Sequence, residues 1–295
     1  MSADRPLLGA IEAGGTKFVL GVGHGPDDII EQVQIATRDP ATTLAETHAF
    51  FARYPGIAAI GIGSFGPLGR DPRASDWGHI LATPKPGWSG CDLAGSVARA
   101  SCARVAFDTD VNAAALAEAR LGAAQGTAVS VYVTIGTGIG GGVIAAGRIV
   151  GGSGHPEQGH MRPRRSADDQ DFEGLCPFHG DCLEGLASGP AIKARWGRSL
   201  SQLPPEHPAH AIIAGYLAEM CNTLRAVLAP DAITLGGGVM GTPGLFERIV
   251  AAAAASDGGY FAPAAAQVIR RPALAPVSGL VGAFLLAADM LQTDG

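Results

Sequence analysis

The sequence predicts a mixed α/β protein made of two similar halves. In the first half, Leu7–Val22 reads as two apolar runs around a glycine turn, which is the pattern of a β-hairpin. In the second half, the strand pattern Val129–Ile135 is followed by a glycine-rich turn and a second strand at Val143–Ala146. Stretches with helical composition follow both hairpins, so each half is expected to combine a sheet with helices.

The remaining elements follow from local patterns and from cap and turn residues. The strand Arg104–Phe107 ends in Asp108-Thr109-Asp110, and the alanine-rich stretch from Val111 predicts a helix with Asp110 or Asn112 as its cap. Residues 151–185 are expected to be irregular. Further helices are expected at Ala41–Arg53, Asp92–Ala100, Gly189–Trp196, His210–Leu228 and Gly279–Leu291, and further strands at Ile57–Gly63, Ile149–Val150 and Ala232–Leu235.

Composition excludes several classes of protein. The chain has 295 residues, a net charge of −6 and a sequence pI of about 5.7, which disfavours nucleic acid as a partner. The apolar stretch Val277–Leu291 is too short and too interrupted for a membrane span, and the N-terminus does not resemble a signal peptide. Five cysteines, an odd number, argue against a disulfide framework. We therefore expect a cytoplasmic protein.

Glycine is unusually frequent, with 43 residues in the chain. Two segments, Gly61–Gly66 and Gly136–Gly141, match the dinucleotide pattern G-x-G-x-x-G. That pattern requires a following helix, but a loop follows the first segment and a second hairpin follows the other, so the Rossmann interpretation is rejected. We instead expect most of the glycine-rich segments to be loops that face a ligand, namely Gly14-Gly15, Gly61–Gly69, Gly136–Gly142 and Gly236–Gly241.

The two equivalent hairpin turns carry groups that suit phosphate. Gly14-Gly15-Thr16-Lys17 offers backbone N–H groups, a hydroxyl and a cation, although Lys17 does not follow the glycine as a P-loop requires. Thr137 and Gly138 lie at the matching place in the second half. Such donors bind polyphosphate oxygens. The simpler alternative for one turn alone is an ordinary hairpin with a solvated lysine.

Asp110 lies between a strand and a helix, where it is either a helix cap or a general base. A general base there would take the proton from a substrate hydroxyl that attacks a phosphoryl group. Asp108 is two residues earlier, so its side chain points the same way in an extended strand. The residue pattern does not choose between them.

A cluster of His and Cys residues predicts a metal site. Cys176, His179 and Cys182 are spaced by three, and His160 lies sixteen residues before Cys176. Two cysteines and two histidines are a common structural zinc set, and four protein ligands leave no open position for catalysis. His155 competes as the fourth ligand. The alternative is a pair of free buried cysteines beside a surface histidine.

These motifs together resemble the ROK sugar kinases, and most closely their zinc-containing bacterial fructokinases. The resemblance extends from Gly9 to about Gly282, and CPFHGDCLEG in particular looks like the fructokinase branch, whereas glucokinases have a cysteine-richer CxCGxxGC version. It rests on IEAGGTK, GIGSFGP, FDTDVNAAALAE, TIGTGIGGG, HPEQGH, CPFHGDCLEGLASGPAI and LGGGVM.

The resemblance implies an actin-like ATPase fold of two RNase H-like domains with a ligand cleft between them. Residues 1–111, joined by the C-terminal helix 279–295, would form the sugar-side domain with the first phosphate hairpin. Residues 112–278 would form the larger domain with the zinc loop and the nucleotide loops. ROK repressors carry an N-terminal DNA-binding helix-turn-helix, and a hairpin that begins at Leu7 leads us to expect none here.

The resemblance also implies roles for individual residues, with ATP, Mg²⁺ and structural Zn²⁺ as cofactors. Asp110 falls on the catalytic base. The sugar-site positions are Gly66, Asn112, Glu157, His160 and Glu184, with His160 also a zinc ligand beside Cys176, His179 and Cys182. The ATP positions are Gly14, Gly15, Thr16, Lys17, Thr137, Gly138, Pro190, Gly237, Gly238, Val239 and Met240.

Two positions depart from the common family pattern. The family often has Asp where this chain has Glu12, and Asn where it has Thr109. Both resemble fructokinase variants, and Glu12 is the position whose contact with magnesium or water is in question.

The activity implied is ATP-dependent phosphorylation of D-fructose to fructose 6-phosphate by a homodimer with no membrane or nucleic-acid partner. One alternative is a ROK hexokinase that prefers glucose, mannose or an amino sugar. Another, from a different class, is a sugar sensor that does not catalyse.

Overall fold

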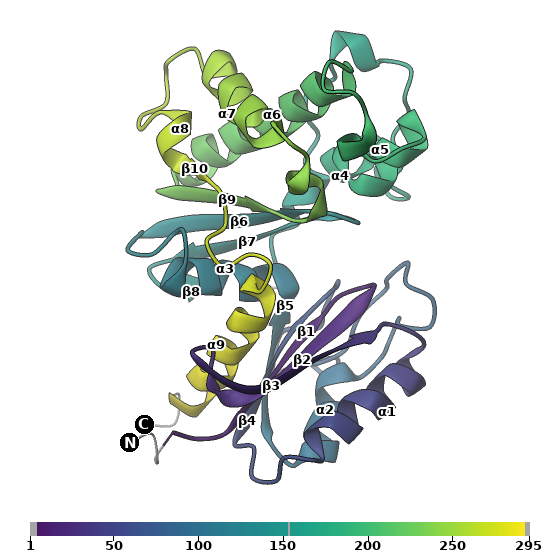
Figure 1. Cartoon of the computed structure of the whole chain (residues 1–295), viewed down its shortest axis with the longest axis vertical. Coiled ribbons are helices and arrows are strands. Elements are labelled where there is room, and N and C mark those ends of the chain that lie inside the picture. Colours follow the sequence, from purple (N-terminus) through teal and green to yellow (C-terminus); the bar gives the residue numbers. More distant parts are fainter. Residues whose placement is uncertain (1–4, 153, 293–295) are drawn as a thin grey trace. The chain divides into compact units, whose positions relative to one another are not determined.

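The computed structural model describes residues 5–152 and 154–292, and these divide into two compact units (Figure 1). The first unit comprises the described residues up to Ala117, the segment Gly151–Gly154 and the residues from Pro276 onward. The second comprises Glu118–Val150 and His155–Ala275. Each unit has a five-stranded sheet in its described residues and helices packed on it, so the predicted α/β class with a repeated hairpin is confirmed.

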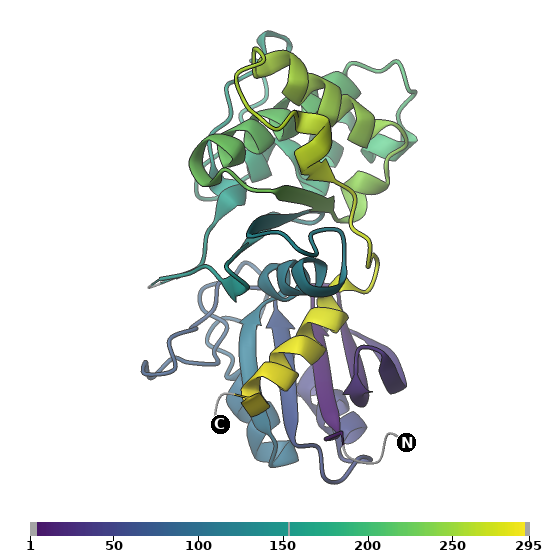
Figure 2. The same ribbon diagram turned by 90° about the vertical axis from the view of Figure 1, so that its left-hand side faces the viewer.

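In the first unit the strand order is β3-β2-β1-β4-β5. The hairpin partners β1 and β2 are antiparallel, as are β2 and β3, while β4 and β5 run parallel to β1. Helices α1 and α2 pack on one face, and α9 crosses the other face (Figures 1 and 2). The bounds are β1 Leu8–Ala13, β2 Lys17–Gly25, β3 Asp28–Ala36, α1 Pro40–Phe51, β4 Ala59–Ser64, α2 Leu93–Ser101, β5 Arg104–Thr109, α3 Asp110–Leu121 and α9 Ser278–Gln292.

Glycines in β4 serve packing and do not form a ligand loop, which corrects the expectation for Gly61 and Gly63 of the segment Gly61–Gly69. A Cβ at Gly61 would lie 1.9 Å from the carbonyl oxygen of Ala283 in α9. A Cβ at Gly63 would lie 2.8 Å from Cβ of Ala113 in α3. Because real Cβ atoms do not approach other atoms this closely, glycine is what allows both helices to pack directly on the strand.

In the second unit the strand order is β10-β9-β6-β7-β8, again with an antiparallel hairpin (β6–β7) beside parallel neighbours. The strands are β6 Val129–Ile135, β7 Ile139–Ala145, β8 Arg148–Ile149, β9 Ala232–Gly236 and β10 Ile269–Arg270. The helices are α4 Leu183–Ala187, α5 Gly189–Trp196, α6 Ala209–Leu228, α7 Leu245–Ser256 and α8 Ala265–Val268, with 3₁₀ turns η1 Gln158–His160, η2 Ala167–Asp169, η3 Leu200–Gln202 and η4 Gly238–Gly241.

The second strand of this hairpin begins four residues earlier than predicted, at Ile139 instead of Val143, because the glycine run belongs to β7. Gly140, Gly141 and Gly142 pair with Thr134, Val133 and Tyr132 of β6. A Cβ at Gly141 would lie 2.0 Å from Oε1 of Gln158 in η1. The glycines therefore let η1 lie directly on the strand, and only Gly136–Gly138 form the turn.

Helix α6 is the one described helix that is long and apolar enough to cross a membrane. Its side chains Ile213, Tyr216, Leu217 and Cys221 are buried in the hydrophobic core of the second unit. We therefore interpret α6 as a core helix.

Candidate functional site

The two carboxylates at the end of β5 have different surroundings. Asp108 is 7% exposed, and its Oδ2 lies 2.7 Å from the Arg70 guanidinium while its Oδ1 accepts a hydrogen bond from Asn112 Nδ2 at 2.7 Å. Asp110, the first residue of α3, is half-buried and accepts a hydrogen bond from the Val111 N–H at 2.8 Å. Because both oxygens of Asp108 already contact Arg70 and Asn112, they are not available to a substrate hydroxyl, and Asp110 is the candidate for a proton acceptor.

The helix cap is Thr109 and not Asp110 or Asn112, which corrects that expectation. The Thr109 hydroxyl accepts a hydrogen bond from the Asn112 N–H at 3.1 Å, the usual geometry of an N-cap. Asn112 is 0% exposed, and its amide lies against Asp108. These contacts make Asn112 a residue that orients Asp108. Arg70 was missed because no local pattern links it to a carboxylate 38 residues away.

The first hairpin turn presents the phosphate candidates of the first unit. The Gly14 N–H donates to the Lys17 carbonyl at 2.9 Å, and the Thr37 hydroxyl donates to the Gly14 carbonyl at 2.7 Å. Gly15, Thr16 and Lys17 are exposed. The Thr37 hydroxyl therefore anchors the first residue of the turn, while the residues at its tip are exposed to solvent.

Glu12, which precedes this turn, contacts the beginning of α9. Its carboxylate accepts a hydrogen bond from the Leu280 N–H, and a Cβ at Gly279 would collide with it. Burial raises the pKa of the Glu12 carboxyl above its usual value, and the charge of Lys17 opposes that shift. Glutamate is one methylene longer than the aspartate that the family resemblance leads one to expect, and this length lets its carboxylate reach the N-terminus of α9, where the helix dipole favours an acceptor.

A pocket of about 380 Å³ in the second unit brings several predicted nucleotide residues together. Thr137, Pro190, Gly238 and Val239 line it. Sequence reasoning missed the contributions of η3 and its neighbours, for which the Ser199/Gln202 capping box was the available signal. Gly136, expected in a ligand-facing loop, also lines the pocket, and the residues missed are Gly189, Ile192, Ser199, Leu200, Ser201 and Thr242.

Three predicted nucleotide residues of this unit do not line the pocket. Met240 is 8% exposed and belongs to the hydrophobic core. Gly237 has φ +93°, and a Cβ there would lie 2.4 Å from the Ile135 carbonyl oxygen. A Cβ at Gly138 would lie 2.6 Å from Oε2 of Glu184. Gly237 and Gly138 therefore shape the backbone around the pocket.

A larger groove of about 530 Å³ lies elsewhere in the second unit, along α6 and α7. Its walls include Arg164, Arg165, Tyr216 and Glu219, together with small residues of both helices. It contains none of the predicted site residues, so its size does not make it the site of the chemistry.

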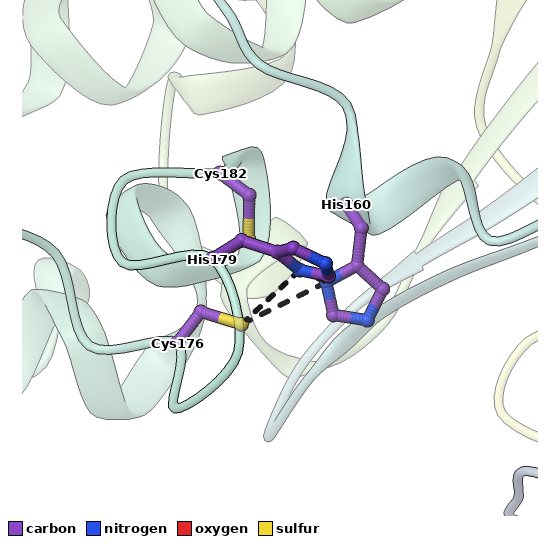
Figure 3. Close-up of side chains that lie close together, drawn as sticks. All are labelled: His160, Cys176, His179 and Cys182. Carbon is purple, nitrogen blue, oxygen red and sulfur yellow. Dashed lines mark hydrogen bonds between the residues drawn. The ribbon is translucent and has the colours of Figure 1, made fainter.

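Four side chains converge on one point in the second unit (Figure 3). His160 comes from η1, Cys176 and His179 come from the irregular segment, and Cys182 caps α4. The Nδ1 atom of His160 lies 3.8 Å from Cys176 Sγ, 3.5 Å from Cys182 Sγ and 3.2 Å from Nδ1 of His179. Zn–S bonds of about 2.3 Å and Zn–N bonds of about 2.0–2.1 Å at tetrahedral angles require ligand separations of roughly 3.3–3.8 Å. The three separations from His160 are close to this range, and all four ligand atoms lie within 4.8 Å of one another, so these side chains could hold a zinc ion.

His155 has another partner than the metal cluster. Its Nε2 lies 2.9 Å from Oε1 of Glu157, and it is not among the clustered ligand residues found in the described part of the chain. The hydrogen bond from His155 lowers the pKa of the Glu157 carboxyl, against an opposing effect of burial. Glu157 is therefore held as a carboxylate three residues before His160 of the cluster.

The predicted sugar residues are divided between the two units. Gly66, after β4, and Asn112 belong to the first unit, while Glu157, His160 and Glu184 belong to the second. Glu157 and Glu184 lie within three residues of cluster members in the sequence, and His160 belongs to the cluster. Glu184 Oε2 accepts a hydrogen bond from the Ile139 N–H at 2.9 Å.

Comparisons with known proteins give a consistent result. A model described as the ROK family matches residues 8–290. A relative named fructokinase from Zymomonas mobilis is 43% identical over 295 residues, covering 97% of this chain and 98% of its own, and one of the same name from Pediococcus pentosaceus is 42% identical over 287 residues, covering 97% and 99%.

Solved structures agree with this comparison. A ROK hexokinase from Thermus thermophilus superposes with a TM-score of 0.78 at 29% identity, covering 98% of this chain and all of its own. A ROK family glucokinase from Streptomyces griseus, solved in complex with glucose and AMPPNP, superposes with a TM-score of 0.76 at 26% identity, covering 96% and 99%.

Proposed function

Because the chain belongs to the ROK family, with its actin-like ATPase fold, we propose that it is a fructokinase that converts D-fructose and ATP to fructose 6-phosphate and ADP. The observation that carries the proposal is identity of 43% and 42% to two relatives named fructokinase over nearly the whole chain. The neighbours named hexokinase and glucokinase are only 29% and 26% identical.

Asp110 is the proposed general base. Its carboxylate takes the proton of the fructose 6-hydroxyl as that oxygen attacks the γ-phosphorus of ATP, and ADP leaves. The paired Asp108 keeps the end of β5 fixed through Arg70 and Asn112. Magnesium would accompany ATP and neutralise phosphate charge. The first hairpin turn, Gly14 to Lys17, supplies N–H, hydroxyl and ammonium donors for the phosphates.

Sugar binding is proposed for Gly66 and for three residues around the metal cluster. Glu157, held ionised by His155, accepts hydrogen bonds from sugar hydroxyls. His160 directs Nδ1 to the cluster, so its Nε2 is the nitrogen left for the sugar. In Glu184, Oε2 already accepts from Ile139, so Oε1 would meet the sugar.

Structural zinc is proposed for His160, Cys176, His179 and Cys182. Bound there, the ion would stabilise the irregular segment between η1 and α4, and four protein ligands would leave it no open position for chemistry. The ligand separations support this assignment.

The pocket beside Thr137 and Gly238 is proposed to hold the adenosine of ATP. Gly238 has open space where a Cβ would be, and it lines the pocket. Gly238→Leu should therefore fill part of the pocket and raise KM for ATP about tenfold or more, with a much smaller effect on KM for fructose. Steady-state kinetics with each substrate varied measures both constants.

Gly241→Leu is the matched control. Gly241 lies in the same 3₁₀ turn, also with open space at its Cβ, but does not line the pocket. Equal effects of the two leucines on KM for ATP would remove the assignment of the pocket.

A panel of hexoses tests the substrate. We expect kcat/KM measured by coupled ADP release to be highest with fructose, above glucose, mannose and amino sugars. A higher value for another hexose would replace fructokinase by a hexokinase of that preference. ADP release with none of them would instead favour a sugar sensor.

We further propose that the first unit supplies Asp110, the sugar residue Gly66 and the first phosphate hairpin, and that the second supplies the nucleotide pocket, the zinc site and the other three sugar residues. A homodimer in the cytoplasm is proposed on the family resemblance. The net charge of −6 supports the expectation of no nucleic-acid partner.

A further inference from the structure

One short segment of the second unit joins the metal cluster to the nucleotide pocket. It begins at the metal ligand Cys182, continues through α4, and ends at Gly189, the first residue of α5. Gly189 and its neighbour Pro190 line the pocket. Only seven positions therefore separate a metal ligand from the pocket wall.

This segment holds the turn Gly136–Gly138 on both sides, at Gly136 and at Ile139, the first residue of β7. At the first end, the Gly189 N–H donates to the Gly136 carbonyl at 2.8 Å. At the other end, the Ile139 N–H donates to Glu184 Oε2 at 2.9 Å. The turn includes Thr137, one of the residues that line the pocket. Since a carboxylate is the stronger acceptor, Glu184 makes the stronger of the two contacts.

The segment that carries His160 also contacts Ile139. Residue Gly159, next to the ligand His160, lies so close to β7 that a Cβ would be 1.8 Å from the Ile139 carbonyl oxygen. The Leu183 N–H donates to the Met161 carbonyl at 2.8 Å, which links the segment around His160 to α4. The segment around His160 and the segment that begins at Cys182 therefore both contact Ile139, the residue that follows the turn.

Helix α4 has only five residues, and its N-cap Cys182 makes no side-chain capping hydrogen bond. Helices this short are not stable by themselves. Zinc bound to Cys182 and His160 would fix the N-cap of α4 relative to η1, and with it the place of Glu184 opposite Ile139.

From these contacts we propose that Glu184 couples zinc binding to nucleotide binding: its carboxylate holds the turn at Thr137 in the nucleotide-binding shape when zinc fixes α4. Glu184 is a positioning residue in this role. The inference rests on the proposed function for the identity of the pocket's ligand. Because coupling between two sites is reciprocal, ADP must raise the affinity for zinc by the same factor as zinc raises the affinity for ADP.

The test measures both affinities in the full-length protein without sugar. Calorimetry gives Kd for Mg·ADP with zinc bound and after chelation, and competition with a chromogenic chelator gives Kd for zinc with and without saturating ADP. We expect zinc to tighten ADP binding about tenfold and ADP to tighten zinc binding by the same factor.

Three variants show whether Glu184 carries the coupling. In Glu184→Ala the factor should fall to about one, and in Glu184→Gln, which retains a neutral acceptor, it should be partly restored. Glu173→Ala, which removes an exposed carboxylate from the same loop, should keep the wild-type factor.

Two results would overturn the inference. Equal ADP affinity with and without zinc would show that the buried side chains of α4 hold Glu184 without the metal. An unchanged coupling factor in Glu184→Ala would show that zinc affects ADP binding through the stability of the whole unit and not through Glu184. Absence of ADP binding by the wild type in either zinc state would instead contradict the proposed function.

Discussion

Asp110→Asn should lower kcat by at least about a hundredfold, the usual range for loss of a general base being 10²–10⁴. The amide has nearly the same shape, and its oxygen can still accept the hydrogen bond from the Val111 N–H, which is 2.8 Å long in the structure. It cannot take the proton of the attacking hydroxyl. Fructose binding should therefore remain, which calorimetry with fructose alone measures beside kcat from coupled ADP release.

Asp108→Asn is the control that separates the two carboxylates. Asp108 and Arg70 form a largely buried ion pair, with side-chain exposures of 10% and 18%. Neutralising one partner leaves an unpaired buried charge, which costs about 3–5 kcal/mol of unfolding free energy. We expect a lowered Tm for this variant and, in the folded fraction, more turnover than Asp110→Asn retains. Near-normal kcat in Asp110→Asn would refute the assignment of Asp110.

Loss of zinc should have the second largest effect. Freshly purified protein should contain about one zinc per chain, and Cys182→Ser should contain almost none, because a serine hydroxyl is a poor replacement for a thiolate. A metal present at a hundred times its Kd contributes about 2.7 kcal/mol to stability. Tm of the variant should therefore fall by roughly 5–10 °C. Elemental analysis and thermal unfolding measure the two quantities.

Cys102→Ser is the matched control, since Cys102 is an exposed free thiol of the first unit. It should keep its zinc and the wild-type Tm. Finding no zinc in the fresh wild-type protein would reject the metal site. Finding zinc in Cys182→Ser at the wild-type level would instead reject the ligand set.

The clustering of the four His and Cys side chains could be predicted because the information for it is mostly local. Cys176, His179 and Cys182 share one loop, and only His160 comes from outside it. The spacing brings three ligands together whatever the rest of the chain does. The same locality explains the correct prediction of both hairpins and of α5, Gly189–Trp196, whose bounds agree with the structure.

The glycine runs show where local reasoning failed. Gly61 and Gly141 look like turn residues in the sequence, but each lies within a strand and accommodates a neighbouring element. The partner of Gly61 is Ala283, more than two hundred residues later. A pattern within ten residues contains no information about such a partner, so the ligand-loop expectation was wrong at these positions.

The sequence by itself determined the α/β class, the two equivalent hairpins, the group of His and Cys residues that cluster, and the positions that resemble sugar-kinase motifs. These depend on periodicity, on turn residues and on short spacings, which act between neighbours in the chain. The tertiary structure alone decided that Asp108 pairs with Arg70, that Glu12 reaches the Leu280 N–H, and that Glu184 holds Ile139. Each of these contacts joins residues that only folding brings together, because hydrogen bonds and ion pairs act over a few ångströms whatever the distance along the chain.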